Sequence, residues 1–546
     1  MPEQRDLLKI AAAAPATATI KADHGSHGLR FGAAQPFSYE WLKNHAKTLA
    51  AGPYQPPPQP DPNIVANIDY DAYGKLKYKQ DFALYGDGQP GVFPITFMFV
   101  GHYFPKTVRM FALEKGAKQA REILYDPKYF EIPTSSVAQR LADNPSCMAG
   151  FWVMEAKTGP LDWHREEPWV TFLGASYFRA KGELGQVGIS ARGITLTPGG
   201  SGPEEFPDFV AFWFAPGESS SDPLECYALL DGPSVTGAYR FALQRTKAVI
   251  TDVEATLFFR NPVERLGLAP LTSMYWYSET VKPVAVDWRP EVHDSDGLAI
   301  WNGNGERLWR PLNNPPRIII SSFSDQNPRG FGLMQRDRSF DHYLDGVMYE
   351  KRPSVWIEPV GNWGSGAVHL VEIPTDDEIN DNIIAYWCPT KPIQAKDQID
   401  LRYRLHWVAN EPYPSSLARC VATRLGRGGR SGQPHPAGVR KFMVEFLGDP
   451  LMGLREDAKP EPILWASRGT FSYSNTEKVP GGVPGLWRAE FDLVVDGHDP
   501  VEMRLFLKIG DQVLTETWLY QYHPFPTKGH GPEEHVYVDG TSRLRS

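Results

Sequence analysis

Residues 209–214 read Phe209-Val210-Ala211-Phe212-Trp213-Phe214, and residues 239–243 read Tyr239-Arg240-Phe241-Ala242-Leu243. Each run has the length of a β-strand and is rich in the aromatic and branched residues that strands favour. Similar runs recur between turn-forming Gly, Pro, Asn and Asp residues, the clearest being 93–100, 150–154, 169–173, 317–323, 354–358, 369–373, 383–388 and 400–407. This spacing predicts an all-β fold of stacked antiparallel sheets.

Helices are expected only in short pieces. Ser38 is placed as the N-cap of a helix that runs to Ala51, with Trp41 and Leu42 near one face. The ranges 115–124 and 136–141 are also expected to be short helices. The proline-rich run 53–62 cannot continue a helix, so it is expected to cross the surface.

The length of 546 residues exceeds what one hydrophobic core usually supports. Prolines near residue 410 mark the expected boundary between a large domain, 26–410, and a small domain, 411–526. Strands at 442–446, 465–472, 486–495, 501–509 and 515–522 predict a small immunoglobulin-like sandwich for the second. Residues 1–25 are expected to be a disordered tail or the remnant of an export leader, and 527–546 a polar tail.

Composition argues against several classes of partner. The net charge of −9 gives no electrostatic reason to bind nucleic acid or anionic lipid. No apolar run approaches the roughly 18 residues of a membrane helix, so membrane insertion is not expected. The cysteines are far apart and form no CxxC motif, which favours isolated buried thiols. They are Cys147, Cys226, Cys388 and Cys420.

Two acidic clusters bracket the segment 288–387, which is dense in Trp, Tyr, Arg and Asn. The first cluster is His293-Asp294-Ser295-Asp296-Gly297, and the second lies within 372–382. Cleavage of a glycosidic bond needs a pair of carboxyl groups, and aromatic faces stack on sugar rings. We interpret the segment as carbohydrate-active, although a solvated turn and an exposed acidic loop would leave the same pattern.

Other types of site lack their sequence patterns. There is no GxSxG, HExxH or Walker motif, and the histidines show no metal-ligand spacing. The first acidic cluster does not match an EF-hand, because its glycine stands at position four and position twelve is Gly305. We therefore expect neither a cofactor nor a metal site.

Several longer motifs resemble the periplasmic glucan biosynthesis proteins of the G and D type, and are closer to the D type. They cover most of residues 30–410, and two shorter matches, 442–448 and 516–518, extend the likeness to the C-terminal region. The motifs are Leu173-Gly174-Ala175-Ser176-Tyr177-Phe178-Arg179, 188–193, 204–207, 288–297, 309–315, 330–338 and 381–387.

This resemblance implies a large galactose-mutarotase-like β-sandwich followed by an immunoglobulin-like β-sandwich. It also implies a periplasmic location, a possible homodimer, and a role in making osmoregulated periplasmic glucans, whose backbone is β-1,2-linked glucose. Members of the family act on linear or cyclic forms of β-1,2-glucan as inverting endo-β-1,2-glucanases, and some act as transglycosylases that close chains into rings.

Carried onto this chain, the resemblance implies Asp381 as the general acid. Asp294 or Asp296 would be the base, and we favour Asp294, with a proton path through water or a substrate hydroxyl. Glu378 would help to hold substrate. The other candidates for substrate contact are His293, Tyr349, Arg352, Trp301, Trp309 and Arg310.

Two further readings stay open at the level of sequence. The chain could be a non-catalytic glucan-binding protein that assists a membrane glucan synthase, and mutarotase activity is suggested by the fold alone. The glycine-rich segment 424–440 is a candidate cover for a cleft, where exclusion of water would favour transfer over hydrolysis.

Overall fold

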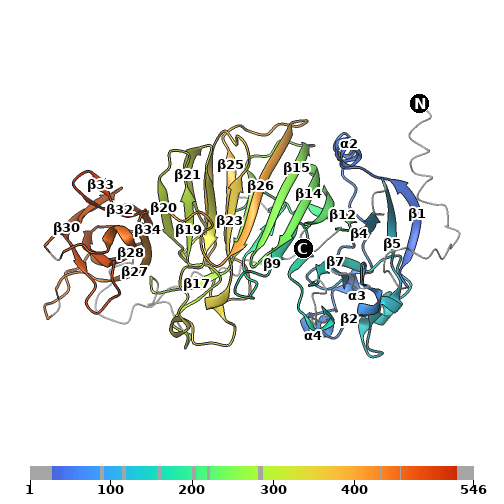
Figure 1. Cartoon of the computed structure of the whole chain (residues 1–546), viewed down its shortest axis with the longest axis horizontal. Helices are drawn as coiled ribbons and strands as arrows, with labels where there is room; N and C mark the ends of the chain where they lie inside the picture. The colour runs from blue at the N-terminus through green and yellow to red at the C-terminus, as the bar shows by residue number, and fades with distance from the viewer. Residues whose placement is uncertain are drawn as a thin grey trace.

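The computed structural model describes residues 28–86, 92–113, 118–155, 163–199, 204–217, 222–280, 287–430, 432–455 and 457–524. The predicted terminal tails, 1–25 and 527–546, lie outside these ranges. Within them the chain is an all-β sandwich, which confirms the predicted fold class. The C-terminal strands occupy one end of the molecule and β1, β4 and β5 the opposite end, with β14, β15 and β26 between them (Figure 1).

Most described strands belong to two large sheets. The 16-stranded sheet of the described residues contains, in order, β1 (Arg30–Pro36), β5 (Gln119–Leu124), β4 (Arg109–Leu113), β12 (Asp208–Ala215), β13 (Leu224–Asp231), β14 (Val235–Arg245), β15 (Val249–Phe259), β26 (Gln398–Val408), β23 (Ser354–Pro359), β22 (Gly330–Met334), β19 (Gly297–Trp301), β20 (Arg307–Pro311), β34 (Thr517–Tyr522), β32 (Val501–Ile509) and β29 (Glu461–Ala466), with β33 (Gln512–Val513) beside β32.

The 10-stranded sheet of the described residues contains β21 (Ile319–Gln326), β24 (Ser365–Glu372), β25 (Ile383–Pro389), β16 (Leu266–Ser273), β10 (Ser190–Arg192), β9 (Tyr177–Ala180), β8 (Val170–Leu173), β7 (Met148–Val153) and β3 (Ile95–Phe99), with β11 (Ile194–Leu196) beside β16. The smaller sheets are β27 (Arg419–Arg427), β28 (Val439–Leu447), β31 (Leu486–Val494) and β30 (Thr470–Lys478); β17 (Tyr275–Tyr277) and β18 (Val292–His293); and β2 (Lys77–Tyr78) and β6 (Phe130–Glu131).

Strand β12 explains why the two large sheets form a sandwich. Phe212 lies edge-on to Phe151 of the 10-stranded sheet, with ring centroids 4.9 Å apart. Trp213 points to the other face, where its ring stacks on Phe37 at 5.1 Å. Because successive side chains of a strand point to opposite faces, this one apolar run fills the inter-sheet core and also seats the helix that follows Phe37.

That helix is α2 (Tyr39–Ala50), and Ser38 caps it by accepting a hydrogen bond from the backbone N–H of Trp41 at 3.0 Å. The range 136–141, predicted to be a short helix, forms the 3₁₀ helix η3 (Val137–Leu141). The other short helices are α3 (Pro62–Val65), α4 (Tyr70–Gly74), η1 (Gln80–Phe82), η2 (Pro127–Tyr129), η4 (Trp163–Arg165), η6 (Phe340–His342), η7 (Tyr349–Lys351) and η8 (Asp449–Leu451).

Two predicted elements are wrong. The described part of 115–124 is strand β5 and not a helix, because it pairs with both β1 and β4 and this pairing overrides local propensity. The range 465–472 is not one strand: β29 ends at Ala466, and β30 begins at Thr470 after Gly469, whose φ of 82° makes the turn.

The strands from β27 to β34 pack around a second hydrophobic cluster, in which Phe442 stacks on Phe491 at 5.1 Å, and Ala299, Trp309, Met334 and Trp356 of the large sheet belong to the same cluster. The large sheet also continues into this part of the chain, because β34 pairs in parallel with β20, matching Trp309 with Trp518. The division of the chain at residue 410 stays a prediction. No helix of the described residues has the length and apolar character needed to cross a membrane.

Candidate active site

Asp294 directly follows β18, and its backbone N–H donates a hydrogen bond to the carbonyl of Met274 at 2.8 Å. Its residue surface is only 8% exposed, and Arg352 Nε lies 3.4 Å from Asp294 Oδ1. Oδ1 accepts no hydrogen bond from the described residues. Burial raises the pKa of Asp294 to about 6, against the lowering effect of Arg352.

Asp381 lies just before β25, where its neighbour Asn382 anchors the chain. Asn382 Oδ1 accepts a hydrogen bond from the Tyr275 N–H at 2.8 Å, and Nδ2 donates to the Ile373 carbonyl at 2.9 Å. The Asp381 residue is exposed, yet desolvation by the surrounding protein raises its pKa. Both hold for a side chain that solvent reaches on one side while many protein atoms surround it on the others.

The two carboxylates share one electrostatic environment. The charge of Asp381 helps to raise the pKa of Asp294, after the larger effect of burial. Arg352 lowers the pKa of both carboxyl groups, and so does Arg179 on β9. These residues come from distant parts of the sequence, so the fold brings the two acidic clusters to the same space.

Glu378 contacts Tyr349 and Arg289, and Tyr349 in turn lies beside Arg352. Tyr349 Oη donates a hydrogen bond to Glu378 Oε2 at 2.6 Å, and Arg289 Nη1 lies 2.8 Å from the same oxygen. The Arg289 hydrogen bond, with that of Tyr349, holds the pKa of Glu378 below its usual range. The Arg352 guanidinium lies 5.1 Å from the Tyr349 ring centroid, which connects Glu378 to the partner of Asp294.

Asp296 and His293 form hydrogen bonds with other parts of the protein. Asp296 Oδ2 accepts hydrogen bonds from the backbone N–H groups of Arg336 and Asp337 at 2.8 and 2.7 Å, which is a role in holding a turn. His293 is completely buried and bonds to Glu291 and Gln335. Burial leaves His293 no surface for the predicted substrate contact, and the contacts of Asp296 favour Asp294 as the base.

Three other predicted substrate contacts lie at the joint between β20 and the C-terminal strands. Trp309 is 4% exposed, and the Arg336 guanidinium lies 3.6 Å from its ring centroid. Arg310 is 1% exposed and forms an ion pair with Glu372. Trp301 is half-buried under Arg307 at 3.7 Å. Burial accounts for Trp309 and Arg310 as packing residues, and the structure does not bring these three side chains to the carboxylates.

The segment 424–440 forms a hairpin end. Strand β27 continues through Arg427, so the first part of the segment is strand and not loop. Beyond it, the Gly429 N–H donates to Asp492 Oδ2 at 3.0 Å, and His435 bonds to the Gly428 carbonyl. These contacts stay within the C-terminal strands and give no support to a cover over the carboxylates.

Sequence reasoning missed Arg179. It lies between the buried residues Phe178 and Ala180 of β9, so the alternation of the strand turns its side chain outward. Its guanidinium makes no hydrogen bond or ion pair within the described residues, while Arg192 is paired with Glu204 and Arg352 lies beside Asp294. The alternation of residues 177–180 was the available signal.

Comparison with known proteins assigns the chain to a family. The family described as "Periplasmic glucan biosynthesis protein, MdoG" matches residues 37–522. The chain belongs to this family. It is 57% identical to glucans biosynthesis protein D 2 of Ralstonia nicotianae over 502 residues, 91% of this chain and 93% of the relative. It is 44% identical to glucans biosynthesis protein D of Xanthomonas campestris over 536 residues, 96% and 98% of the two chains.

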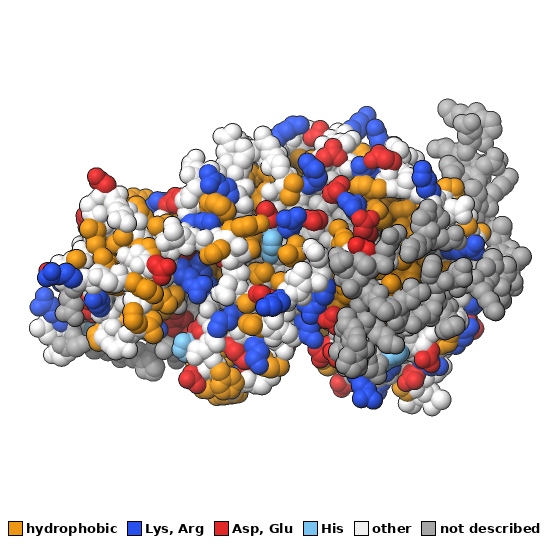
Figure 2. Space-filling view, viewed as in Figure 1, with side chains coloured by type: hydrophobic (Ala, Val, Ile, Leu, Met, Phe, Trp, Pro, Cys, Tyr) orange, Lys and Arg blue, Asp and Glu red, His pale blue; other side chains and the backbone are white. Residues whose placement is uncertain are grey.

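This family member takes part in periplasmic glucan biosynthesis, and the family's description implies that it acts in the periplasm. Acidic and basic side chains are interspersed over the face shown in Figure 2, and no single-sign patch of the kind that binds a polyanion dominates that face.

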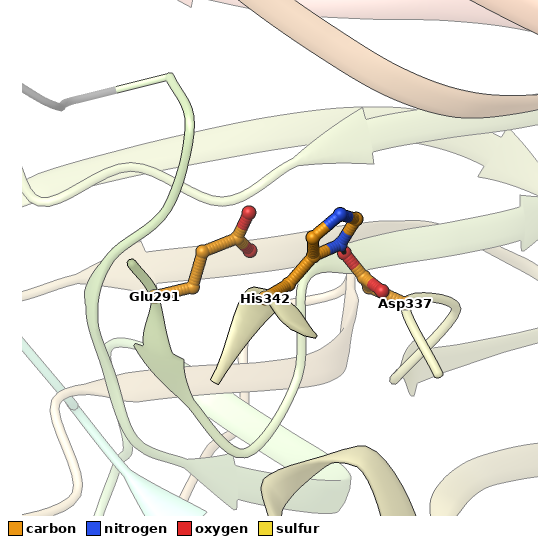
Figure 3. Close-up of side chains that lie close together, drawn as sticks. All are labelled: Glu291, Asp337 and His342. Atoms are coloured by element: carbon orange, nitrogen blue, oxygen red, sulfur yellow. Dashed lines mark hydrogen bonds and ion pairs between the residues drawn. The ribbon is translucent and has the colours of Figure 1, made fainter. Parts of the chain in front are cut away.

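A second polar cluster lies next to Asp296, whose Oδ2 accepts the hydrogen bond from the Asp337 N–H. One ligand-type atom from each of Glu291, Asp337 and His342 lies within 4.8 Å of the others. The imidazole of His342 lies between the two carboxylates (Figure 3). Burial, and then the charge of Asp337, raises the pKa of Glu291 to about 7. His342 bonds to Asp337 and His293 bonds to Glu291, so partners within the protein already satisfy these groups.

We therefore expect no metal dependence from this second cluster. Adding EDTA to the protein, or Zn²⁺ in slight excess, should leave the melting temperature unchanged, because a ligand shifts stability only when it binds the folded state. The measurement is a thermal unfolding curve by circular dichroism. A rise in melting temperature with Zn²⁺ that disappears in His342→Ala would contradict the expectation.

Proposed function

We propose that this protein is an anomer-inverting glycoside hydrolase or cyclising transglycosylase that acts on the β-1,2-glucan backbone. The observation that carries the proposal is the contact of Arg352 Nε with Asp294 Oδ1 at 3.4 Å, beside which Arg352 and Arg179 also lower the pKa of Asp381. Inverting enzymes need one carboxylic acid that protonates the leaving oxygen and one carboxylate that activates the attacking hydroxyl. Membership in a glucan biosynthesis family supports glucan as the substrate.

The acid role suits Asp381. Its residue is exposed, so it can reach a bound glycosidic oxygen directly. Desolvation raises the pKa of Asp381, which helps the carboxyl group to keep its proton until the leaving oxygen takes it.

The base role suits Asp294, through an intermediary. Its residue is 8% exposed, so a sugar ring cannot lie directly against the carboxylate. Oδ1 has almost no accessible surface and lies 3.4 Å from Arg352 Nε, so we assign the other oxygen, Oδ2, as the one that accepts a hydrogen bond from a water molecule or a substrate hydroxyl. In the proposed path, the attacking oxygen loses its proton to this intermediary as the intermediary passes a proton to Asp294.

The identity of the attacking oxygen separates hydrolysis from ring closure. Attack by water releases two linear chains. Attack on the same anomeric carbon by the far-end hydroxyl of the chain closes a ring and releases the displaced segment as a shorter linear chain. Incubation of the purified protein with linear β-1,2-glucan, followed by mass analysis, tests this. Each hydrolytic cut adds one water to the total product mass, and a ring lacks one water relative to its linear counterpart. Absence of any product would favour the glucan-binding alternative.

Removal of the Arg179 charge is expected to move the pH profile. Arg179 lowers the pKa of both carboxyl groups, so Arg179→Ala should raise both. Both limbs of the bell-shaped profile of kcat/KM should then move to higher pH. We also assign Arg179, whose guanidinium has no hydrogen-bond partner within the described residues, a hydrogen bond to a substrate hydroxyl. Loss of this charged hydrogen bond should lower the value at the optimum roughly tenfold.

The control for Arg179→Ala is Arg179→Lys, which keeps the positive charge and should keep the limbs near their original pH. A profile that only loses height in Arg179→Ala, with both limbs in place, would show that Arg179 does not act on the carboxylates.

A further inference from the structure

A cavity of about 160 Å³ lies where the start of β12 meets the turn before β9. Its lining includes Tyr103, Phe104, Lys106, Ala175 and Asp208. Pockets that enclose drug-sized ligands measure roughly 300–1,000 Å³, so this one suits a smaller group, about one ring.

The polar part of the cavity is an ion pair with one buried partner, Asp208, and one partly exposed partner, Lys106, whose side chain is 37% exposed. Asp208 is 5% exposed, and Lys106 Nζ lies 2.5 Å from Asp208 Oδ2. Burial raises the pKa of Asp208, and Lys106 opposes this. The pair offers an acceptor and donors side by side with little net charge. Sugar hydroxyl groups both donate and accept hydrogen bonds, so a neutral sugar matches this pair better than an anion or a cation does.

The apolar part of the cavity includes an aromatic ring in solvent. Tyr103 is 71% exposed and lies beside Phe104, with ring centroids 6.5 Å apart. Phe104 is held from behind by Tyr73, edge-on at 5.2 Å. An aromatic ring beside an ion pair is a combination that small-ligand sites use: the ring supplies contact area, and the polar groups fix orientation.

The wall of the cavity has a strained backbone. Ala175 has a φ of 39°, in the left-handed region that residues with a Cβ rarely adopt. Its carbonyl accepts a hydrogen bond from the Phe209 N–H at 3.0 Å, which ties this turn to β12. Such strain persists only where the surroundings over-determine the conformation, and it gathers at ligand sites.

The same turn leads to the candidate active site. The Tyr177 N–H donates to the Gly174 carbonyl at 3.0 Å, and the Arg192 guanidinium lies 4.9 Å from the Tyr177 ring centroid. Arg192 is one of the cations that lower the pKa of Asp381. The turn at Ala175 in the cavity wall is therefore two residues away from Tyr177, which contacts one of the arginines that act on Asp381.

We infer that this cavity is an accessory sugar site, which holds one glucose ring of a β-1,2-glucan chain whose other part lies at Asp294 and Asp381. The inference rests on the proposed function and deepens it. A second anchor point on the same polymer raises the affinity for long chains, because the second contact is made within one complex. Short oligosaccharides that reach only the carboxylates gain nothing from it.

The test is isothermal titration calorimetry with a short and a long linear β-1,2-glucan. Tyr103→Ala is expected to weaken binding of the long chain about tenfold and to leave the short one unchanged. Tyr103→Phe, which keeps the ring, should bind both as the wild type does. Because Tyr103 is 71% exposed, its removal should not disturb folding.

The matched control is Trp465→Ala, which removes a ring that is 55% exposed on β29 of the C-terminal strands. It should bind both glucans normally. Equal affinity of Tyr103→Ala and the wild type for the long chain would overturn the accessory site and leave the proposed function standing. Failure of the wild type to bind either glucan would overturn both.

Discussion

Replacement of Asp381 by asparagine is expected to lower kcat on β-1,2-glucan by roughly 10²–10⁴-fold, the usual contribution of a positioned general acid. Asparagine has nearly the same shape but carries no acidic proton, so the leaving oxygen would depart unprotonated. The affinity for glucan should stay nearly the same, because the exposed side chain keeps its place before the anchored Asn382. The measurement pairs initial rates with binding by calorimetry.

Asp376→Asn is the matched control for this experiment. Asp376 lies in the same acidic loop and is exposed, so the substitution makes the same change of charge close by. It should keep kcat close to that of the wild type. If Asp376→Asn and Asp381→Asn lose activity equally, the loop acts through its net charge and Asp381 is not the acid.

The fold could be predicted from the sequence wherever local pattern and tertiary packing agree. The apolar run at β12 satisfies both, because Phe212 fills the inter-sheet core and Trp213 packs near α2. The prediction failed at β5, where a helix-compatible sequence is held as a strand by its pairing with β1 and β4. Such pairing depends on segments far away in the sequence, so no local pattern reveals it.

The candidate site shows the same limit. The sequence indicated two acidic clusters, but only the fold separates Asp294, beside Arg352, from Asp296, which holds a turn. Trp309 and Arg310 have the composition of a sugar site, yet burial assigns them to the joint with the C-terminal strands. Aromatic and arginine side chains serve both purposes, so residue type alone cannot choose between a cleft and a core.

Glu372→Gln is expected to destabilise the protein by about 3–5 kcal/mol, as the loss of one partner of a buried ion pair does. Glu372 is completely buried, and its carboxylate accepts hydrogen bonds from Arg310 Nη2 at 2.9 Å and from the Asn313 N–H at 2.7 Å. Glutamine would leave the Arg310 charge in the interior without a counter-charge. Chemical denaturation measures the change in the free energy of unfolding.

Glu122→Gln breaks an ion pair of the other kind and is the matched control. Its partner, Arg109, has a side chain that is 61% exposed, so the loss should be about 0–1 kcal/mol. Glu372→Gln should also leave KM for glucan unchanged in the folded protein, because Arg310 is 1% exposed and cannot touch substrate. A large rise in KM for Glu372→Gln, with an unchanged free energy of unfolding, would instead indicate that Arg310 contacts substrate. If Arg310 only stabilises the packing between β20 and the C-terminal strands, the substitution lowers stability and leaves the affinity for glucan unchanged.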